Sequence, residues 1–222
     1  MKTFIKLFLL VAFASCASLA DQRIAPNYLN AFSSIKGYFF GYDEYPVSRE
    51  LLENIPYASM SLSVGRGSAG LLILEDITNS EYTYISADGI RFVLRKGIIV
   101  RTSGFDNNLT RKLQPKDYLQ NFMKAKEIEK HLFVYHSYDK PKLTDLKLSV
   151  NLKKIGLEEH TIFGVSYKLF RVEETIESEY LGWTKNNVYL LDPKDYYVWK
   201  SIQNLSPLLP EVSYEITKKP AL

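Results

Sequence analysis

The fold is decided by "EDITNSEYTYISADGIRFVLRKGIIVRTSG", the stretch Glu75–Gly104. Runs rich in β-branched and aromatic residues alternate in it with short turn sequences. Asp88-Gly89 is a strong hairpin signal between two such runs, and Lys96-Gly97 indicates a second tight turn. The stretch therefore predicts an antiparallel meander.

Three glycines just before this stretch match the G-x-G-x-x-G spacing of a dinucleotide-binding loop. They are Gly65, Gly67 and Gly70 in "SLSVGRGSAGLLIL". Such a loop binds pyrophosphate only when a helix follows it, because the helix N-terminus receives the anion. Leu71–Leu74 has neither an N-cap before it nor helical spacing within it. We therefore predict a hairpin connection whose glycines allow positive φ, and we expect no NAD, FAD or other cofactor.

Composition points to one β-rich domain. The chain has 222 residues, of which 46% are hydrophobic and 14% aromatic, enough for a sizeable core. Its net charge of +3 is scattered and no dense basic run occurs, which argues against nucleic acid as a partner. The fold class predicted is mainly β, a single antiparallel meander sheet with a few short helices.

The second half of the chain contains one helix candidate and several strand candidates. "LQPKDYLQNFMKAKEIEKHL", residues 113–132, favours a helix in which Leu119, Phe122 and Met123 share a face. Residues 146–152 and 163–167 alternate with period two, as strands do. The tail predicts a hairpin about the turn Asp192–Asp195, then a last strand, "VSYEIT". One of Tyr197 and Trp199 is expected to face the core.

The N-terminus has the layout of a secretory signal: Lys2 and Lys6, an apolar stretch too short to span a membrane, then small residues. Cys16 is the only cysteine, so no internal disulfide can form. The residues ending at Cys16 resemble the bacterial lipobox, in which the cysteine carries the lipid anchor. This predicts a signal peptide at 1–15, a lipidated tether at 16–27 and a β domain at 28–222. The alternative is ordinary cleavage after Ala20, which gives a secreted or soluble periplasmic protein.

No catalytic motif stands out. The chain contains no H-E-x-x-H sequence and no G-x-S-x-G nucleophile elbow. Glu158, Glu159 and His160 lie together, but between two strand patterns, so a solvated hairpin end is favoured over a metal site. Aromatic residues could stack on sugars, although core packing explains them as well. We predict no catalytic, metal or cofactor-binding residues, and a protein that is not an enzyme.

Three stretches resemble the group 4 capsule polysaccharide lipoprotein family (GfcB/YjbF type). They are "IPYASMSLSVG" at 55–65, "DGIRFVLRKGIIVRTSGFDNNL" at 88–109 and "VYLLDPKDYYVWKSIQNLSPLLPEVSYEITKKP" at 188–220. The resemblance implies an antiparallel sheet curved into a barrel or half-barrel, with no known active site. It also implies a lipoprotein of the outer membrane that faces the periplasm, with outer-membrane and periplasmic polysaccharide-export proteins as partners.

Three functions remain open at this stage. The leading hypothesis is a non-enzymatic lipoprotein accessory to exopolysaccharide or capsule production or secretion. The alternative is a periplasmic carrier or a glycan- or lipid-binding protein with a half-barrel cavity, and a glycan hydrolase comes third. A curved sheet with an apolar, unfilled concave face would favour the carrier. Two carboxylates about 5–9 Å apart in an aromatic cleft would favour the hydrolase, and a filled barrel with a flat exposed patch the accessory role.

Overall fold

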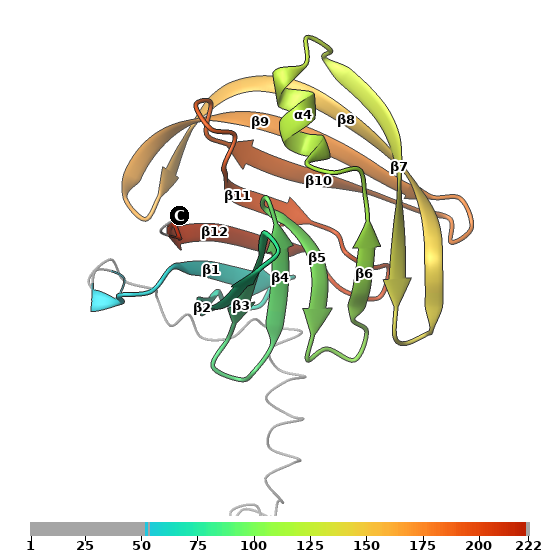
Figure 1. Ribbon diagram of the computed structural model, residues 1–222, viewed down its shortest axis with the longest axis horizontal. Coiled ribbons are helices and arrows are strands. Elements are labelled where there is room, and N and C mark those ends of the chain that lie inside the picture. The colour runs from blue at the N-terminus through green and yellow to red at the C-terminus, as the bar shows by residue number, and fades with distance from the viewer. Residues whose placement is uncertain (1–51, 53, 221–222) are drawn as a thin grey trace, which may run out of the picture. The chain divides into compact units, whose positions relative to one another are not determined.

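Residues 75–104 fold as the meander that their sequence predicts, in a computed structural model that describes residues 52 and 54–220 (Figure 1). Tight turns join the strands at the expected places. Lys96 and Gly97 both have positive φ, 51° and 85°, as a two-residue hairpin turn of type I′ requires. Gly89, with φ 85°, lies in the preceding turn, where Ser86 and Ile90 hydrogen-bond across the loop. Both predicted turns are confirmed.

The glycines of the G-x-G-x-x-G sequence connect two strands, as predicted. Gly65 and Gly67 lie in the connection and Gly70 begins the next strand, so a strand and not a helix follows the motif. Positive φ is needed only at Gly65, where it is 58°; the expectation that all three glycines use it is wrong. The Gly65 N–H donates to the Glu211 carbonyl at 2.8 Å, which ties the turn to the chain before the last strand.

The described residues form twelve strands and the helix α4, and all neighbouring strands in the sheet are antiparallel. The sheet order is β5-β4-β3-β2-β1-β12-β11-β10-β9-β8-β7-β6, so the C-terminal strand β12 pairs with the first strand β1. The bounds are β1 Ser59–Val64, β2 Gly70–Thr78, β3 Glu81–Ile85, β4 Arg91–Arg95, β5 Ile98–Ser103, β6 Leu109–Leu113, α4 Tyr118–Lys124, β7 Glu129–Tyr138, β8 Leu143–Ile162, β9 Val165–Ser178, β10 Trp183–Leu191, β11 Val198–Gln203 and β12 Val212–Lys218.

The sheet curves until its two edge strands, β5 and β6, lie side by side (Figure 1). Backbone pairing does not extend across this seam, so the barrel is nearly closed. Side chains satisfy some of the backbone groups there: Leu109 N–H donates to Thr102 Oγ1 and Ile99 N–H to Gln203 Oε1, both at 3.0 Å. Buried backbone donors need such partners when no ladder supplies them. The predicted mainly β fold curved into a barrel is confirmed.

Helix α4 is much shorter than the predicted helix over 113–132. It runs from Tyr118 to Lys124, and residues from Glu129 onward belong to β7. The sequence favours a longer helix, but pairing of β7 with β8 overrides that propensity. Lys154 of β8 fixes the helix end, because its ammonium donates to the Ala125 and Met123 carbonyls.

The interior of the barrel is filled by side chains from the strands and from α4. Leu119 and Phe122 of α4 are fully buried and Met123 nearly so, which confirms that these three residues share the inward face. They join one hydrophobic cluster that includes residues of every strand. A second, smaller cluster forms from Ile162, Leu169 and Leu190.

The β8–β9 and β10–β11 hairpins correct two details of the expectations. Phe163 and Gly164 form the turn between β8 and β9, with φ of 46° and 79°, and are not part of the strand that the alternation suggested. The turn at 192–195 is confirmed between β10 and β11. Tyr197 and Trp199 are both half-buried and pack edge to face, with ring centroids 5.7 Å apart. The expectation that only one of them faces the core is wrong, because both rings pack against the hydrophobic cluster.

No helix among residues 52 and 54–220 is both long enough and apolar enough to cross a bilayer.

Candidate functional site

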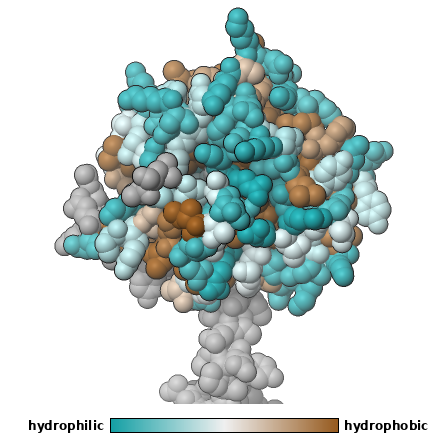
Figure 2. Space-filling model, viewed as in Figure 1, coloured by the Kyte–Doolittle hydropathy of each residue, from teal (hydrophilic) through white to brown (hydrophobic). Residues whose placement is uncertain are grey.

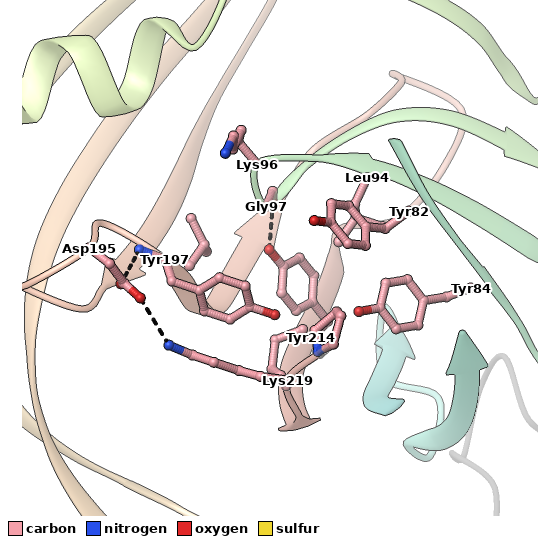
Figure 3. Close-up of a pocket in the computed structure, with 12 residues that line it drawn as sticks. Tyr82, Tyr84, Leu94, Lys96, Gly97, Asp195, Tyr197, Tyr214 and Lys219 are labelled. Atoms are coloured by element: carbon pink, nitrogen blue, oxygen red, sulfur yellow. Dashed lines mark hydrogen bonds and ion pairs between the residues drawn. The ribbon is translucent and has the colours of Figure 1, made fainter. Parts of the chain in front are cut away.

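A tyrosine-lined pocket of about 110 Å³ lies beside the β4–β5 turn, between β3, β11 and β12 (Figure 3). We call it the tyrosine pocket. Tyr82 and Tyr84 reach it from β3, Tyr197 from the β10–β11 connection and Tyr214 from β12. The tyrosines on β3 are two residues apart and so share one face of the strand. The pocket therefore depends on segments that are distant in the sequence.

Gly97 lies in the wall of the pocket, where its backbone is in close contact with neighbouring side chains. The Tyr214 hydroxyl and the Gln203 amide both donate to the Gly97 carbonyl. A Cβ at this position would lie 2.4 Å from Cβ of Val198, closer than real Cβ atoms approach. Positive φ and this close contact together explain why a glycine occupies the turn.

Burial keeps three phenols of the pocket neutral. Burial raises the pKa of Tyr84, Tyr197 and Tyr214 well above the ordinary value of 10.0. The Tyr84 pKa is raised further by the nearby Tyr82. At neutral pH these side chains present O–H groups that can donate and accept hydrogen bonds, on rings that supply an apolar surface.

One cation lies over the aromatic rim of the pocket. The Lys219 ammonium is 4.3 Å from the ring centroid of Tyr197 and 4.6 Å from that of Trp199, and its nitrogen is 3.3 Å from Asp195 Oδ2. Tyr167 extends the aromatic surface beyond Trp199, with ring centroids 4.9 Å apart. Aromatic faces, hydroxyl groups and a fixed charge suit a ligand with both apolar C–H surface and polar groups, as a sugar has.

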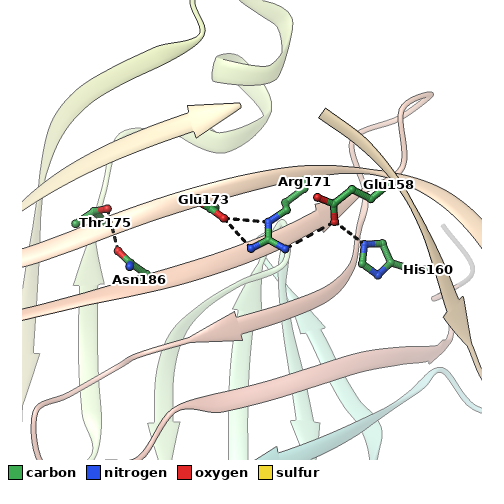
Figure 4. Close-up of polar contacts among 6 residues, drawn as sticks. All are labelled: Glu158, His160, Arg171, Glu173, Thr175 and Asn186. Atoms are coloured by element: carbon green, nitrogen blue, oxygen red, sulfur yellow. Dashed lines mark hydrogen bonds and ion pairs between the residues drawn. The ribbon is translucent and has the colours of Figure 1, made fainter. Parts of the chain in front are cut away.

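Glu158 and His160, the pair considered for a metal, are engaged with an arginine on the barrel surface (Figure 4). His160 Nε2 lies 3.2 Å and Arg171 Nη1 3.7 Å from Glu158 Oε2, and Arg171 also pairs with Glu173 at 2.7 Å. Glu159 accepts a hydrogen bond from Ser166. Partly exposed ion pairs of this kind contribute little stability. Within the described residues no group of three or more His, Cys, Asp or Glu is placed to hold a metal ion.

A buried polar network was missed by sequence reasoning. The carboxylate of Glu174, which is fully buried, accepts hydrogen bonds from Tyr118 Oη and Asn187 Nδ2 at 2.6 Å each and from Tyr189 Oη at 2.8 Å. Burial raises the pKa of Tyr118 and Tyr189, and the nearby Glu174 charge raises it further. The burial of Glu174 could have been predicted from the sequence. Glu174 lies midway between Val172 and Ile176, which occupy core positions of the same alternating strand.

The network also explains how α4 is held. Tyr118 is the first residue of the helix, whereas Glu174 lies on β9 and the other two donors on β10. The Tyr118–Glu174 hydrogen bond therefore fixes the start of α4 to the barrel wall. Hydrogen bonds to a charged group are stronger than those between neutral groups.

His136 is also buried, and it is neutral. Burial and the Lys112 charge lower its pKa well below the ordinary value of 6.5. Its Nδ1 lies 3.0 Å from the Tyr138 hydroxyl, which donates to the Leu205 carbonyl at 2.8 Å. Within the described part of the chain, His136 Nε2 has no hydrogen-bond partner. His131, by contrast, is exposed and contacts Ser149. None of these histidines lines the tyrosine pocket.

The fold and the pocket together define a filled antiparallel barrel with a small aromatic pocket. The model of the family "Group 4 capsule polysaccharide lipoprotein gfcB, YjbF" matches residues 32–217, and the chain belongs to this family. The predicted family is therefore confirmed, and with it a lipoprotein family linked to capsule polysaccharide. No match was found among the curated proteins.

One solved structure shares the fold. The hypothetical lipoprotein YmcC from Escherichia coli (K12) is similar with a TM-score of 0.69 and 20% identity, covering 80% of this chain and 92% of that one. A lipoprotein from Parabacteroides distasonis has 11% identity and a TM-score of 0.38, with 72% and 92% of the two chains covered. At this identity the likeness to YmcC shows the fold alone.

The lipid-attachment residue Cys16 lies outside the described residues. The signal peptide at 1–15 and the tether at 16–27 lie outside them as well, so all three remain predictions.

Proposed function

We propose that the chain is a non-enzymatic outer-membrane lipoprotein, anchored through Cys16, that is accessory to the production or secretion of capsule polysaccharide or exopolysaccharide. Its partners in this role are outer-membrane and periplasmic proteins of polysaccharide export. Family membership supports the link to capsule polysaccharide and the lipoprotein character. The accessory role is our inference from the architecture.

The observation that carries the proposal is the filled interior of the barrel. A carrier that encloses a lipid or a glycan needs an apolar cavity, and pockets for drug-sized ligands occupy about 300–1,000 Å³. Here the side chains of α4 and the strands occupy the interior, and the tyrosine pocket is about 110 Å³. A larger cavity of about 310 Å³ beside β2 and β3 is lined by polar and charged residues and so is not an apolar carrier site. The face shown in Figure 2 is largely hydrophilic, with hydrophobic side chains in small separate groups.

The pocket also supports a non-enzymatic role. Glycoside hydrolysis uses two carboxyl groups about 5–9.5 Å apart. Among the described residues that line the tyrosine pocket, Asp195 is the one carboxylate, and it pairs with Lys219. A neutral phenol with a raised pKa is a weak base and a weak acid at neutral pH.

A direct test combines processing and activity. Mass spectrometry of the mature protein should find an N-terminal Cys16 carrying acyl chains. Incubation of the purified protein with the polysaccharide of its own bacterium should leave the chain length and the number of reducing ends unchanged. A mature N-terminus at Asp21, or new reducing ends, would contradict the proposal.

A second role, the binding of a short glycan segment, is favoured by the aromatic rim. Trp199 and Tyr197 form an aromatic rim over which the Lys219 ammonium lies, so a sugar residue bound here would contact the rings and the charge together. The size of the pocket suits one sugar residue or a chain end rather than a carried molecule.

Titration with oligosaccharides from the bacterium's own polysaccharide tests this second role. Trp199→Ala should weaken binding about tenfold or more, since truncating a central aromatic contact residue costs about 2 kcal/mol. The matched control is Tyr180→Ala, because Tyr180 is an aromatic residue that is 78% exposed and lies away from the pocket. Equal binding by both variants would show that the rim is not a glycan site.

A further inference from the structure

A second cavity lies at the seam of the barrel, where β5 and β6 face each other without a backbone ladder. We call it the seam cavity; its volume is about 170 Å³. Four of the side chains that line it are basic: Arg95, Arg101, Arg111 and Lys112. The cavity thus collects positive charge on both edge strands and on the neighbouring β4.

Lys112 is the most unusual of these residues. It is only 5% exposed, and its strand position is paired with the buried His136. Within residues 52 and 54–220, no hydrogen bond or ion pair is formed by its ammonium group. Burial lowers the pKa of Lys112, and the nearby Glu174 charge opposes this shift. A buried charge without a hydrogen-bond partner is costly, so native proteins nearly always supply one.

The acidic groups nearby are already engaged. Glu81, whose side chain is 11% exposed, uses one carboxylate oxygen for Arg95 and the other for Arg101, the second at 2.6 Å. Arg111 pairs at 2.6 Å with Asp145, which does not line the cavity. Glu81 is the only carboxylate among the described lining residues, so basic groups outnumber acidic ones there by four to one.

Gln114 adds a further polar side chain to the lining. The residue follows β6, and its Oε1 is buried without a hydrogen-bond partner among the described residues. The amide can rotate to present its NH₂ group, since O and N of an amide are exchanged by a flip. The cavity therefore offers donors from Lys112, Gln114 and the arginines.

We infer that the seam cavity binds one small oxyanion, a carboxylate or a phosphate group, with the Lys112 ammonium as its main contact and Arg101 and Arg111 at its entrance. The bound anion joins β5 and β6, the two strands that the backbone ladder leaves unconnected. It also supplies the buried ammonium with the hydrogen-bond acceptor that the described residues lack. This site lies apart from the tyrosine pocket and does not depend on the proposed role in polysaccharide export.

Calorimetric titration of the full-length chain in detergent tests the site, with inorganic phosphate and glucuronate as separate probes at constant ionic strength. At least one of them should bind with a stoichiometry of one. Binding of phosphate alone identifies a phosphate site, and binding of glucuronate identifies a site for an acidic sugar. The absence of binding by both probes overturns the inference.

Variants separate the seam cavity from general attraction to a basic surface. Lys112→Met keeps the length of the side chain and should weaken binding about tenfold or more, because a charge-assisted hydrogen bond is lost. Lys185→Met removes an exposed lysine of β10 and should leave binding unchanged. If Lys112→Met fails to fold, Arg111→Gln, a change at a half-exposed side chain, should still weaken binding. If Lys112→Met folds, or otherwise Arg111→Gln, and binds the probe as tightly as wild type does, the inference is overturned.

Discussion

Replacing Tyr118 by Phe tests how the helix α4 is held in the barrel. The Tyr118 hydroxyl is the only donor in the described structure to Glu174 Oε1, whereas Asn187 and Tyr189 both donate to Oε2. The change keeps the ring and its packing but leaves one oxygen of a fully buried carboxylate without a partner. A hydrogen bond to a charged group contributes about 1.5–3 kcal/mol, so we expect the free energy of unfolding to fall by about that amount.

Urea denaturation followed by tryptophan fluorescence and circular dichroism measures this loss, with the midpoint shifted and the slope unchanged. The matched control is Tyr135→Phe. Tyr135 is 38% exposed on β7 and its hydroxyl makes no hydrogen bond to another described residue, so its variant should differ from wild type by less than about 0.5 kcal/mol. If Tyr118→Phe is as stable as this control, the buried carboxylate does not anchor α4 and the reasoning is wrong.

Three further changes have defined outcomes. Gly97→Ala should lower the free energy of unfolding by about 2–5 kcal/mol, because the cost of a left-handed φ adds to that of a clash with Val198. Gly89→Ala has the same φ of 85° but open space around the new Cβ, so it should cost only about 1–2 kcal/mol. Thermal or urea unfolding measures both. His136 resists protonation in the folded state, so the free energy of unfolding should fall as the pH drops below 6.5, by up to about 1.4 kcal/mol per pH unit. His136→Gln should lack this part of the pH dependence. If the variant and the wild type lose stability equally between pH 7.5 and 5, the prediction is wrong. Cys16→Ala should leave the fold intact but abolish labelling by palmitate. It should also either release the protein from the membrane fraction or block its processing. Equal labelling of variant and wild type would disprove lipidation at this residue.

Local signals predicted the β-hairpins well because they act over a few residues. Asp88-Gly89 and Lys96-Gly97 form turns whose positive φ values follow from the residues themselves. The helix over 113–132 was overpredicted for the opposite reason. Its last four residues, 129–132, pair with residues 150–153, which lie 18 to 24 positions further along the chain, and no local pattern contains that information.

The candidate sites could not be predicted because their residues meet only through the closure of the barrel. The tyrosine pocket joins Tyr84 to Tyr214, which are separated by most of the domain. Lys112 looked like an ordinary polar position in a short strand and became unusual only when its burial was known. Glu174 is the exception, since its place between two core positions of an alternating strand marks it as buried.

The role in polysaccharide production is tested most directly by the amount of polysaccharide on the cell surface. The measurement compares a deletion strain with the same strain complemented by wild type or by Cys16→Ala. We expect deletion to lower the surface polysaccharide, wild type to restore it and Cys16→Ala to fail, with the linkages of the polymer unchanged in every strain. Surface polysaccharide that is unaffected by the deletion would contradict the account.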